Sequence, residues 1–172
     1  MSNFTGDWNK LQNMLNPTRL KNALYKCAAK AGNYGASEVK KGIRSGSPGG
    51  KTFAPLSPVT IANKGSSKPL IDHGDLIGSV TYEVFNDNSS VFIGVKKGKE
   101  VNIAAVHEYG CTIGVTEKMR AYLHYHGIHL KKTTAYIHIP ARPFLSPVFQ
   151  SSEFQKMISV IYMNALREAF LL

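Results

Sequence analysis

The sequence predicts an α+β fold, in which a small antiparallel or mixed β-sheet of about four strands packs against a long N-terminal helix and a C-terminal helix. Three patterns predict it: helical spacing of apolar residues over 17–44, alternating apolar residues over 79–95, and helical spacing again over 154–172. The chain has 172 residues, 43% of them hydrophobic, which suffices for one core but is short for two full domains. A single domain over residues 1–172 is therefore expected.

Two helices are expected at the N-terminus. The first is short, lies within residues 1–16, and depends on apolar residues at helical spacing: Trp8, Leu11 and Leu15. The second begins at Asn16 and Pro17, because asparagine is a good N-cap and proline is favoured at the first helical position. It runs to residue 44 and is expected to be weakened at Gly32 and Gly35, since glycine costs about 1 kcal/mol in a helix interior.

Residues 45–70 are rich in Gly, Pro, Ser and Lys, which predicts an extended loop or arm without long regular structure. The segment contains GGKT, similar to the end of a phosphate-binding loop. The upstream glycine that such a loop requires is absent, and a helix rather than a strand precedes the segment. No nucleotide site and no other cofactor is therefore expected.

The next segment predicts a turn, a helical turn and a β-hairpin. Asp72 to Gly74 form the turn and DLIG the helical turn. Residues 79–85 and 90–95 then alternate apolar with small or polar residues on either side of an Asn-Asp-Asn turn, the pattern of a hairpin. Residues 103–110, IAAVHEYG, are apolar and end at a glycine, so a third strand and a buried short helix both remain open.

Residues 111–132 are expected to form an insertion with a short helix. Thr116 can cap the stretch EKMRAYLHYH, and Gly127 can end it. Residues 133–139, TTAYIHI, predict another strand. The C-terminal helix is amphipathic, with these apolar residues at helical spacing: Met157, Ile158, Ile161, Tyr162, Ala165 and Phe170.

No catalytic or metal site is expected from the six histidines. His124 and His126 would point to opposite sides of a helix, so they would not chelate one ion together. His107 and Glu108 are adjacent, but no nucleophile signature accompanies them. We expect His107 to pack in the core and Glu108 to contact solvent or another subunit. The chain is not predicted to be an enzyme.

The formal net charge of +10 is unevenly distributed. Residues 1–70 hold eleven Lys and Arg against two acidic residues, a net charge of +9. This imbalance favours an acidic partner, nucleic acid or protein, and a solvated basic helix face explains it equally well. The candidate contacts with an acidic partner are Lys40, Lys41, Arg44, Lys51, Lys64 and Lys68.

No apolar run is long enough for a membrane span, and the first residues lack the pattern of a signal peptide. A soluble protein made in the cytoplasm, without a membrane partner, is expected. Cys27 and Cys111 are expected to be reduced thiols.

The stretch IPARPFLSPVF, residues 139–149, predicts a rigid apolar connector with one charge, Arg142. Two roles for Arg142 remain open: contact with a neighbouring subunit, or an intrachain salt bridge that holds the connector to the core. The connector and the arm are the candidate interface patches, with these residues: Phe53, Leu56, Pro140, Arg142, Pro143, Phe144, Leu145 and Phe149.

Five motifs occur in a specific order: FAPLSPVT, LIDHGDLIGSV, AAVHEYG, VTEKMRAYL and IPARPFLSP. Together they resemble the phage virion morphogenesis family, the tail-completion type proteins of contractile-tailed phages and Mu-like prophages. The resemblance runs from about residue 50 to 150 and assigns family motif positions to Leu70, Gly74, Leu76, Ser79, Ala105, His107, Tyr109, Gly110, Pro140, Arg142, Pro143, Phe144 and Leu145.

The sequence departs from this pattern at Glu108, where a neutral polar residue such as glutamine is expected. This departure argues against a direct hydrogen-bond role for the Glu108 side chain.

The resemblance implies a non-enzymatic virion protein at the neck or tail end, which assembles in the host cytoplasm as a homo-oligomeric ring. The implied role is tail completion or head-to-tail joining. The implied partners are other neck or tail proteins and, as a further partner, the DNA that passes through the channel. The alternative is a nucleic-acid-binding module that uses the basic N-terminal half.

Overall fold

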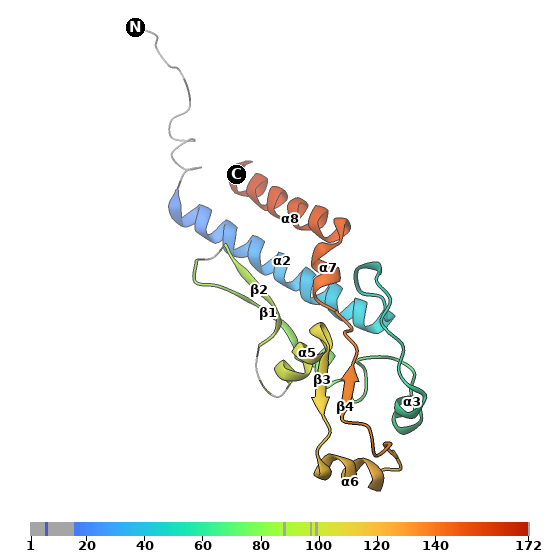
Figure 1. The fold of residues 1–172 in the computed structure, drawn as a ribbon. Helices are drawn as coiled ribbons and strands as arrows, with labels where there is room; N and C mark the ends of the chain where they lie inside the picture. The colour runs from blue at the N-terminus through green and yellow to red at the C-terminus, as the bar shows by residue number, and fades with distance from the viewer. Residues whose placement is uncertain (1–5, 7–15, 88, 97, 99, 172) are drawn as a thin grey trace.

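A computed structural model describes residues 6, 16–87, 89–96, 98 and 100–171. It is an α+β structure, as predicted, and its elongated arrangement is shown in Figure 1. The short helix expected within residues 1–16 lies outside the described residues, apart from Gly6 and Asn16. The described elements are α2 (Pro17–Ser45), η1 (Pro48–Gly50), α3 (Pro58–Lys64), α4 (Asp75–Ser79), β1 (Val80–Val84), β2 (Val91–Val95), α5 (Glu100–Tyr109), β3 (Cys111–Gly114), α6 (Glu117–Tyr125), β4 (Tyr136–Ile139), α7 (Ser146–Gln150) and α8 (Ser152–Leu171).

Helix α2 is the long N-terminal helix that the sequence predicts. Asn16 is its N-cap, because its side-chain oxygen accepts from the N–H groups of Thr18 and Arg19 at 2.9 and 3.3 Å. The helix ends at Gly46, whose φ of 75° is left-handed and suits glycine. Helix α8 lies along α2 (Figure 1), and Tyr34 of α2 stacks on Phe154 of α8 with ring centroids 5.7 Å apart.

The hairpin predicted around residues 79–95 is confirmed. Strands β1 and β2 pair antiparallel, from Val80 opposite Val95 to Val84 opposite Val91, and both pack against α2.

The glycines of α2 have a role here that helix propensity does not show. A Cβ at Gly32 would clash with Tyr82 and Val91, and one at Gly35 would clash with Ile93. The two glycines thus permit the close approach of helix and hairpin.

The described strands form two separate two-stranded sheets rather than one sheet of about four strands. Residues 103–109 belong to helix α5, which resolves the choice between strand and helix. Strand β3 lies inside the expected insertion and pairs antiparallel with β4, from Cys111 opposite Ile139 to Gly114 opposite Tyr136. Gly110, at φ +76°, ends α5, and an added Cβ there would lie 3.0 Å from the Ala141 nitrogen. Only glycine fits this junction.

The arm at 45–70 has short helical pieces, η1 and α3, and no long element, as the sequence predicts. The Ser57 side chain caps α3 by accepting from the N–H of Thr60 at 3.2 Å. Helix α6 is likewise capped by Thr116, which accepts from the N–H of Met119 at 3.1 Å. None of the described helices has the length and apolar character needed to cross a membrane.

The core lies between α2, the β1–β2 hairpin, α4, α5 and α7. Its buried residues are Ala36, Val39, Ile43, Phe53, Leu76, Val80, Ala104, Phe144 and Val148. Residues 111–139, which we call the distal lobe, lie at the opposite end of the molecule from α8 (Figure 1). All of them are described, and none is buried.

Candidate assembly site

Glu108 is the centre of a hydrogen-bonded cluster that joins helix α5 to the connector. The residue is only 8% exposed, and its carboxylate accepts from the N–H groups of Phe144, Leu145 and Ser146 at 2.8, 3.0 and 2.9 Å. The Ser146 hydroxyl also donates to it. Ser146 begins α7, and Leu145 before it offers no side-chain cap. Glu108 therefore supplies the N-terminal cap of α7 from a distant helix.

The structure thus corrects the expectation that Glu108 contacts solvent or another subunit, and that it has no direct hydrogen-bond role. Burial alone would raise the pKa of this carboxyl. The hydroxyl of Ser146 and the three N–H groups outweigh burial and hold the pKa below its ordinary value. Glu108 is consequently a charged residue whose lone pairs are satisfied inside the protein.

Arg142 joins the connector to the arm. Its side chain is buried, and its Nε and Nη2 atoms each donate to a main-chain carbonyl of the arm, those of Ala54 and Pro55, both at 2.8 Å. Its own N–H donates to the His107 carbonyl at 2.6 Å. Of the two roles left open, the contacts are those of an intrachain staple. The acceptors are carbonyl oxygens rather than the carboxylate that a salt bridge requires.

The candidate interface residues divide into two groups. Three are buried within the chain, which corrects the expectation that their side chains face a partner: Phe53, Arg142 and Phe144. They are buried because the arm folds back over the connector and closes the core between them. The others keep partial exposure: Leu56, Pro140, Pro143, Leu145 and Phe149.

A pocket of about 330 Å³, which we call the arm pocket, lies beside this cluster. Three parts of the chain form its wall: the arm, the segment from Leu70 to Leu76, and α5. Gly74 shapes the wall with a left-handed φ of +93° at the start of α4. Ser79 closes the same helix by donating to the Leu76 carbonyl at 2.7 Å. The lining residues are Leu56, Thr60, Lys64, Leu70, Asp72, His73, Gly74, Asp75, Leu76, Ile103 and His107.

His107 stands where the arm pocket meets the cluster. Burial lowers the pKa of His107, and the positive charges of Arg142 and Lys64 lower it further. Its Nδ1 atom is buried and has no hydrogen-bond partner among the described residues. The imidazole is therefore neutral at pH 7, and it packs between arm and connector. Tyr109, in the same motif, is exposed.

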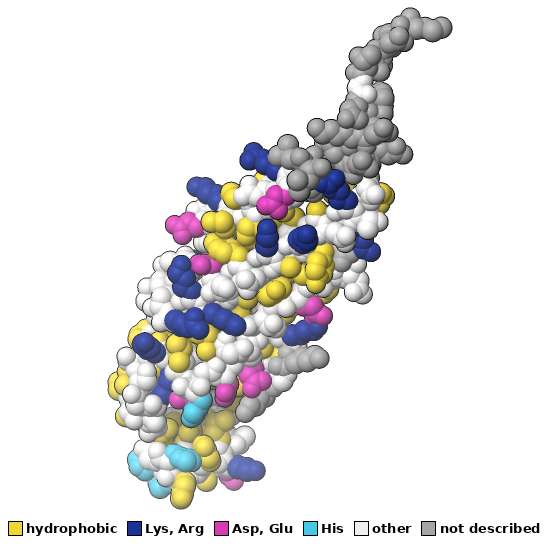
Figure 2. Space-filling model, turned by 180° about the vertical axis from the view of Figure 1, so that it is seen from behind, with side chains coloured by type: hydrophobic (Ala, Val, Ile, Leu, Met, Phe, Trp, Pro, Cys, Tyr) yellow, Lys and Arg dark blue, Asp and Glu magenta, His cyan; other side chains and the backbone are white. Residues whose placement is uncertain are grey.

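The six basic residues predicted to contact an acidic partner lie on two parts of the chain, three at the end of α2 and three in the arm. Lys41 pairs with Glu38 at 3.5 Å, and Lys64 donates to the Lys68 carbonyl. Figure 2 shows Lys and Arg side chains spread along much of one face of the molecule.

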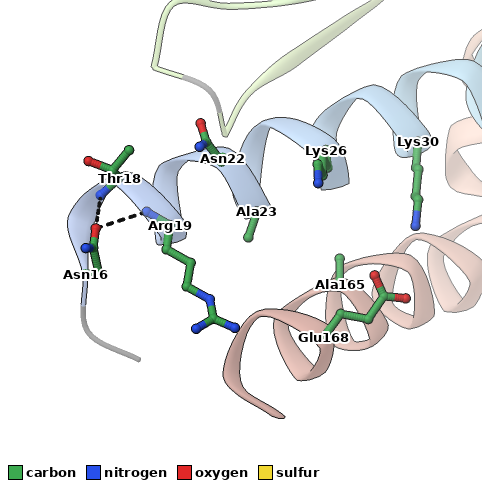
Figure 3. A pocket seen from close by; sticks show the side chains of 9 residues that line it. All are labelled: Asn16, Thr18, Arg19, Asn22, Ala23, Lys26, Lys30, Ala165 and Glu168. Atoms are coloured by element: carbon green, nitrogen blue, oxygen red, sulfur yellow. Dashed lines mark hydrogen bonds between the residues drawn. The ribbon is translucent and has the colours of Figure 1, made fainter. Parts of the chain in front are cut away.

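A basic groove that the prediction missed lies between α2 and α8 (Figure 3). It has a volume of about 480 Å³, and Arg19, Lys26 and Lys30 line it together with Glu168 of α8. Their spacing of seven and four positions places the three basic residues on one face of α2, a signal that was present in the sequence.

The distal lobe exposes aromatic side chains that the prediction also missed. Tyr122 and Tyr125 of α6 are 63% and 86% exposed. The ring of His126 lies against both, with centroids 4.4 Å from Tyr122 and 5.3 Å from Tyr125. Figure 2 shows histidine and hydrophobic side chains together at this end of the molecule. Within the described residues, no group of three or more His, Cys, Asp or Glu is placed to hold a metal ion.

Replacing Arg142 with alanine is expected to lower the free energy of unfolding by about 2–4 kcal/mol, because the buried arginine side chain and its two charged hydrogen bonds to the carbonyls of the arm are lost. The melting temperature should fall by several degrees, since roughly 1 kcal/mol shifts a chain of this size by about 2–4 °C. Thermal unfolding followed by circular dichroism measures this. Arg142→Lys should recover only part of the loss, because a single ammonium lacks the planar fork. An unchanged melting temperature with impaired assembly would favour the subunit contact instead.

Comparison with known protein families gives a match over nearly the whole chain. The profile of a family described as the phage virion morphogenesis family matches residues 7–167, nearly the whole chain. The matched range contains the arm, the connector, the distal lobe and helix α2. No curated protein and no solved structure matches the chain significantly.

Proposed function

Since the chain belongs to the phage virion morphogenesis family, we propose that this structural virion protein acts in tail completion or head-to-tail joining, as a subunit of an oligomeric ring in the neck of a tailed phage. The family match over residues 7–167 carries the proposal. In this role the protein would lie at the neck or tail end of the virion and would catalyse no reaction.

The clustered hydrogen bonds of Glu108 and Arg142 support an assembly role. They bind α5, the arm and the connector into one rigid unit, so little conformational entropy is lost when that unit meets a partner. A closed ring of identical subunits needs two different complementary surfaces on each subunit. The partly exposed side of the connector, including Pro143 and Leu145, and the arm with its pocket supply candidate surfaces.

The test is the size and shape of the purified protein. Light scattering and negative-stain images should show a closed oligomer, formed either by the protein alone or when other neck components are added. Particles assembled without the protein should lack joined tails. A protein that stays monomeric and never enters a particle or binds a neck component would contradict the proposal.

The groove between α2 and α8 favours a second candidate function, binding to nucleic acid. Arg19, Lys26 and Lys30 can neutralise phosphates, and among the described lining residues a single carboxylate, that of Glu168, accompanies them. Duplex DNA should then bind with an affinity that falls steeply with salt. The variant with all three residues changed to alanine should show a weaker salt dependence. Absence of binding at low salt would eliminate this candidate.

A further inference from the structure

The distal lobe buries very little of its own surface. None of residues 111–139 is buried, and the lobe is built from the two-stranded sheet of β3 and β4 and the short helix α6 that connects them. An isolated two-stranded hairpin is marginally stable in water. Arg120 adds order by donating to the carbonyls of Lys131 and Thr134 at 2.9 and 2.8 Å. The lobe contributes no buried residue to a core, and its surface exposes aromatic side chains.

Two tyrosines of α6 form the aromatic part of the lobe. Tyr122 and Tyr125 are three positions apart, so they lie next to each other on the helix surface. Tyrosine offers a large apolar ring with a polar tip and is enriched at protein interfaces. Such exposed rings are typical anchors for a partner pocket.

The arm pocket has the size and lining that an aromatic anchor needs. Its volume of about 330 Å³ is small, near the lower end of the roughly 300–1,000 Å³ of small-molecule pockets. Part of its wall is apolar and comes from separate parts of the chain: Leu56, Leu70, Leu76 and Ile103.

The charges of the two surfaces are complementary. The distal lobe holds four basic residues, Lys118, Arg120, Lys131 and Lys132, against the single acidic residue Glu117. The arm pocket has two exposed carboxylates, Asp72 and Asp75, against one lysine. That lysine, Lys64, already donates to the Lys68 carbonyl. Opposite charges of this kind guide association and fix its orientation.

We propose that the distal lobe of one copy docks on the arm pocket of a second copy, with Tyr122 and Tyr125 as the anchors. No α6 residue lines the arm pocket, so the lobe and the pocket are two different surfaces of one subunit. A contact between different surfaces repeats from copy to copy and can close into a ring. This inference rests on the proposed function, because it names the contact that would build the ring.

The experiment uses two variants that each remove one surface. The lobe variant is Tyr122→Ser with Tyr125→Ser, and the pocket variant is Ile103→Arg, which places a positive charge before a basic lobe. Asp72→Lys serves as a second pocket variant at an exposed position. Tyr25→Ser is the matched control, since Tyr25 is an exposed tyrosine of α2 that belongs to neither surface. Circular dichroism melting establishes that each variant is folded.

Light scattering coupled to size exclusion measures the assembly. The wild type and the Tyr25→Ser control should form the same oligomer, and each surface variant should associate at least a hundredfold more weakly, as expected for loss of anchor residues. An equimolar mixture of the lobe variant and a pocket variant should give a one-to-one dimer and nothing larger, because only one intact pair of surfaces remains.

Two results would overturn the inference while leaving the ring proposal intact. One is an oligomer of normal size from folded surface variants. The other is a mixture in which the two variants remain separate while the wild type forms its ring. A wild type that binds other neck proteins but never itself would also overturn the self-docking contact. A wild type that binds neither other neck proteins nor a second copy of itself would overturn the proposed function as well.

Discussion

Replacing Glu108 with alanine is expected to lower the free energy of unfolding by about 3–5 kcal/mol. The change removes the acceptor for three N–H groups and the Ser146 hydroxyl, of which the Phe144 N–H is buried and the others are partly buried. Helix α7 would lose its cap, and the connector would lose its attachment to α5. Urea unfolding at pH 7 measures the loss through a lower midpoint.

Two controls isolate the role of the Glu108 carboxylate. Glu108→Gln keeps one acceptor oxygen but presents an amide donor to other donors, so its loss should be intermediate. Glu153→Ala removes an exposed carboxylate from the first turn of α8 and should cost about 1 kcal/mol or less. Equal and small losses for all three variants would show that Glu108 does not cap α7 in solution.

The depressed pKa of Glu108 also predicts how stability depends on pH. The pKa of this carboxyl is lower in the folded than in the unfolded state. The carboxyl therefore stabilises the fold at pH values above the pKa of the unfolded state, which is about 4.3 for glutamate. That contribution is lost as the pH falls through the folded pKa. The stability difference between the wild type and Glu108→Gln should therefore be full at pH 7 and shrink below about pH 4.

Replacing Phe144 with alanine is expected to cost about 3–5 kcal/mol, because it leaves a cavity in the centre of the core. Phe144 is fully buried and belongs to the same cluster as Val39, Ile43 and Phe53. The melting temperature should fall by about 10 °C, since roughly 1 kcal/mol corresponds to about 2–4 °C at this chain length. Differential scanning calorimetry would measure it.

Phe149→Ala is the matched control for the Phe144 prediction. Phe149 lies in the same connector but is only partly buried, with its ring 5.3 Å from that of Phe154. Its loss should be clearly smaller. If Phe144→Ala melted like the wild type yet failed to assemble, the ring of Phe144 would be an interface anchor after all, and the burial found here would not describe the protein in solution.

The sequence by itself determined the elements whose signals are local. Asn16 and Pro17 begin α2, Thr116 begins α6, and the turn between 85 and 90 joins β1 to β2. Each signal lies within a few residues of the structure it specifies, because caps and tight turns are made by neighbours in the chain. The ordered motifs likewise pointed to the family that the profile match supports.

The tertiary structure alone decided the roles of Glu108 and Arg142 and the pairing of β3 with β4. Glu108 accepts from the N–H of Phe144, which lies 36 positions later in the chain. Arg142 donates to the Ala54 carbonyl, which lies 88 positions earlier. No local spacing encodes such partners, since they meet only after α5, the arm and the connector have packed. The basic arm and the apolar connector suggested, for the same reason, that Phe53, Arg142 and Phe144 contact a partner. In the folded chain the arm packs on the connector, and these three side chains are buried.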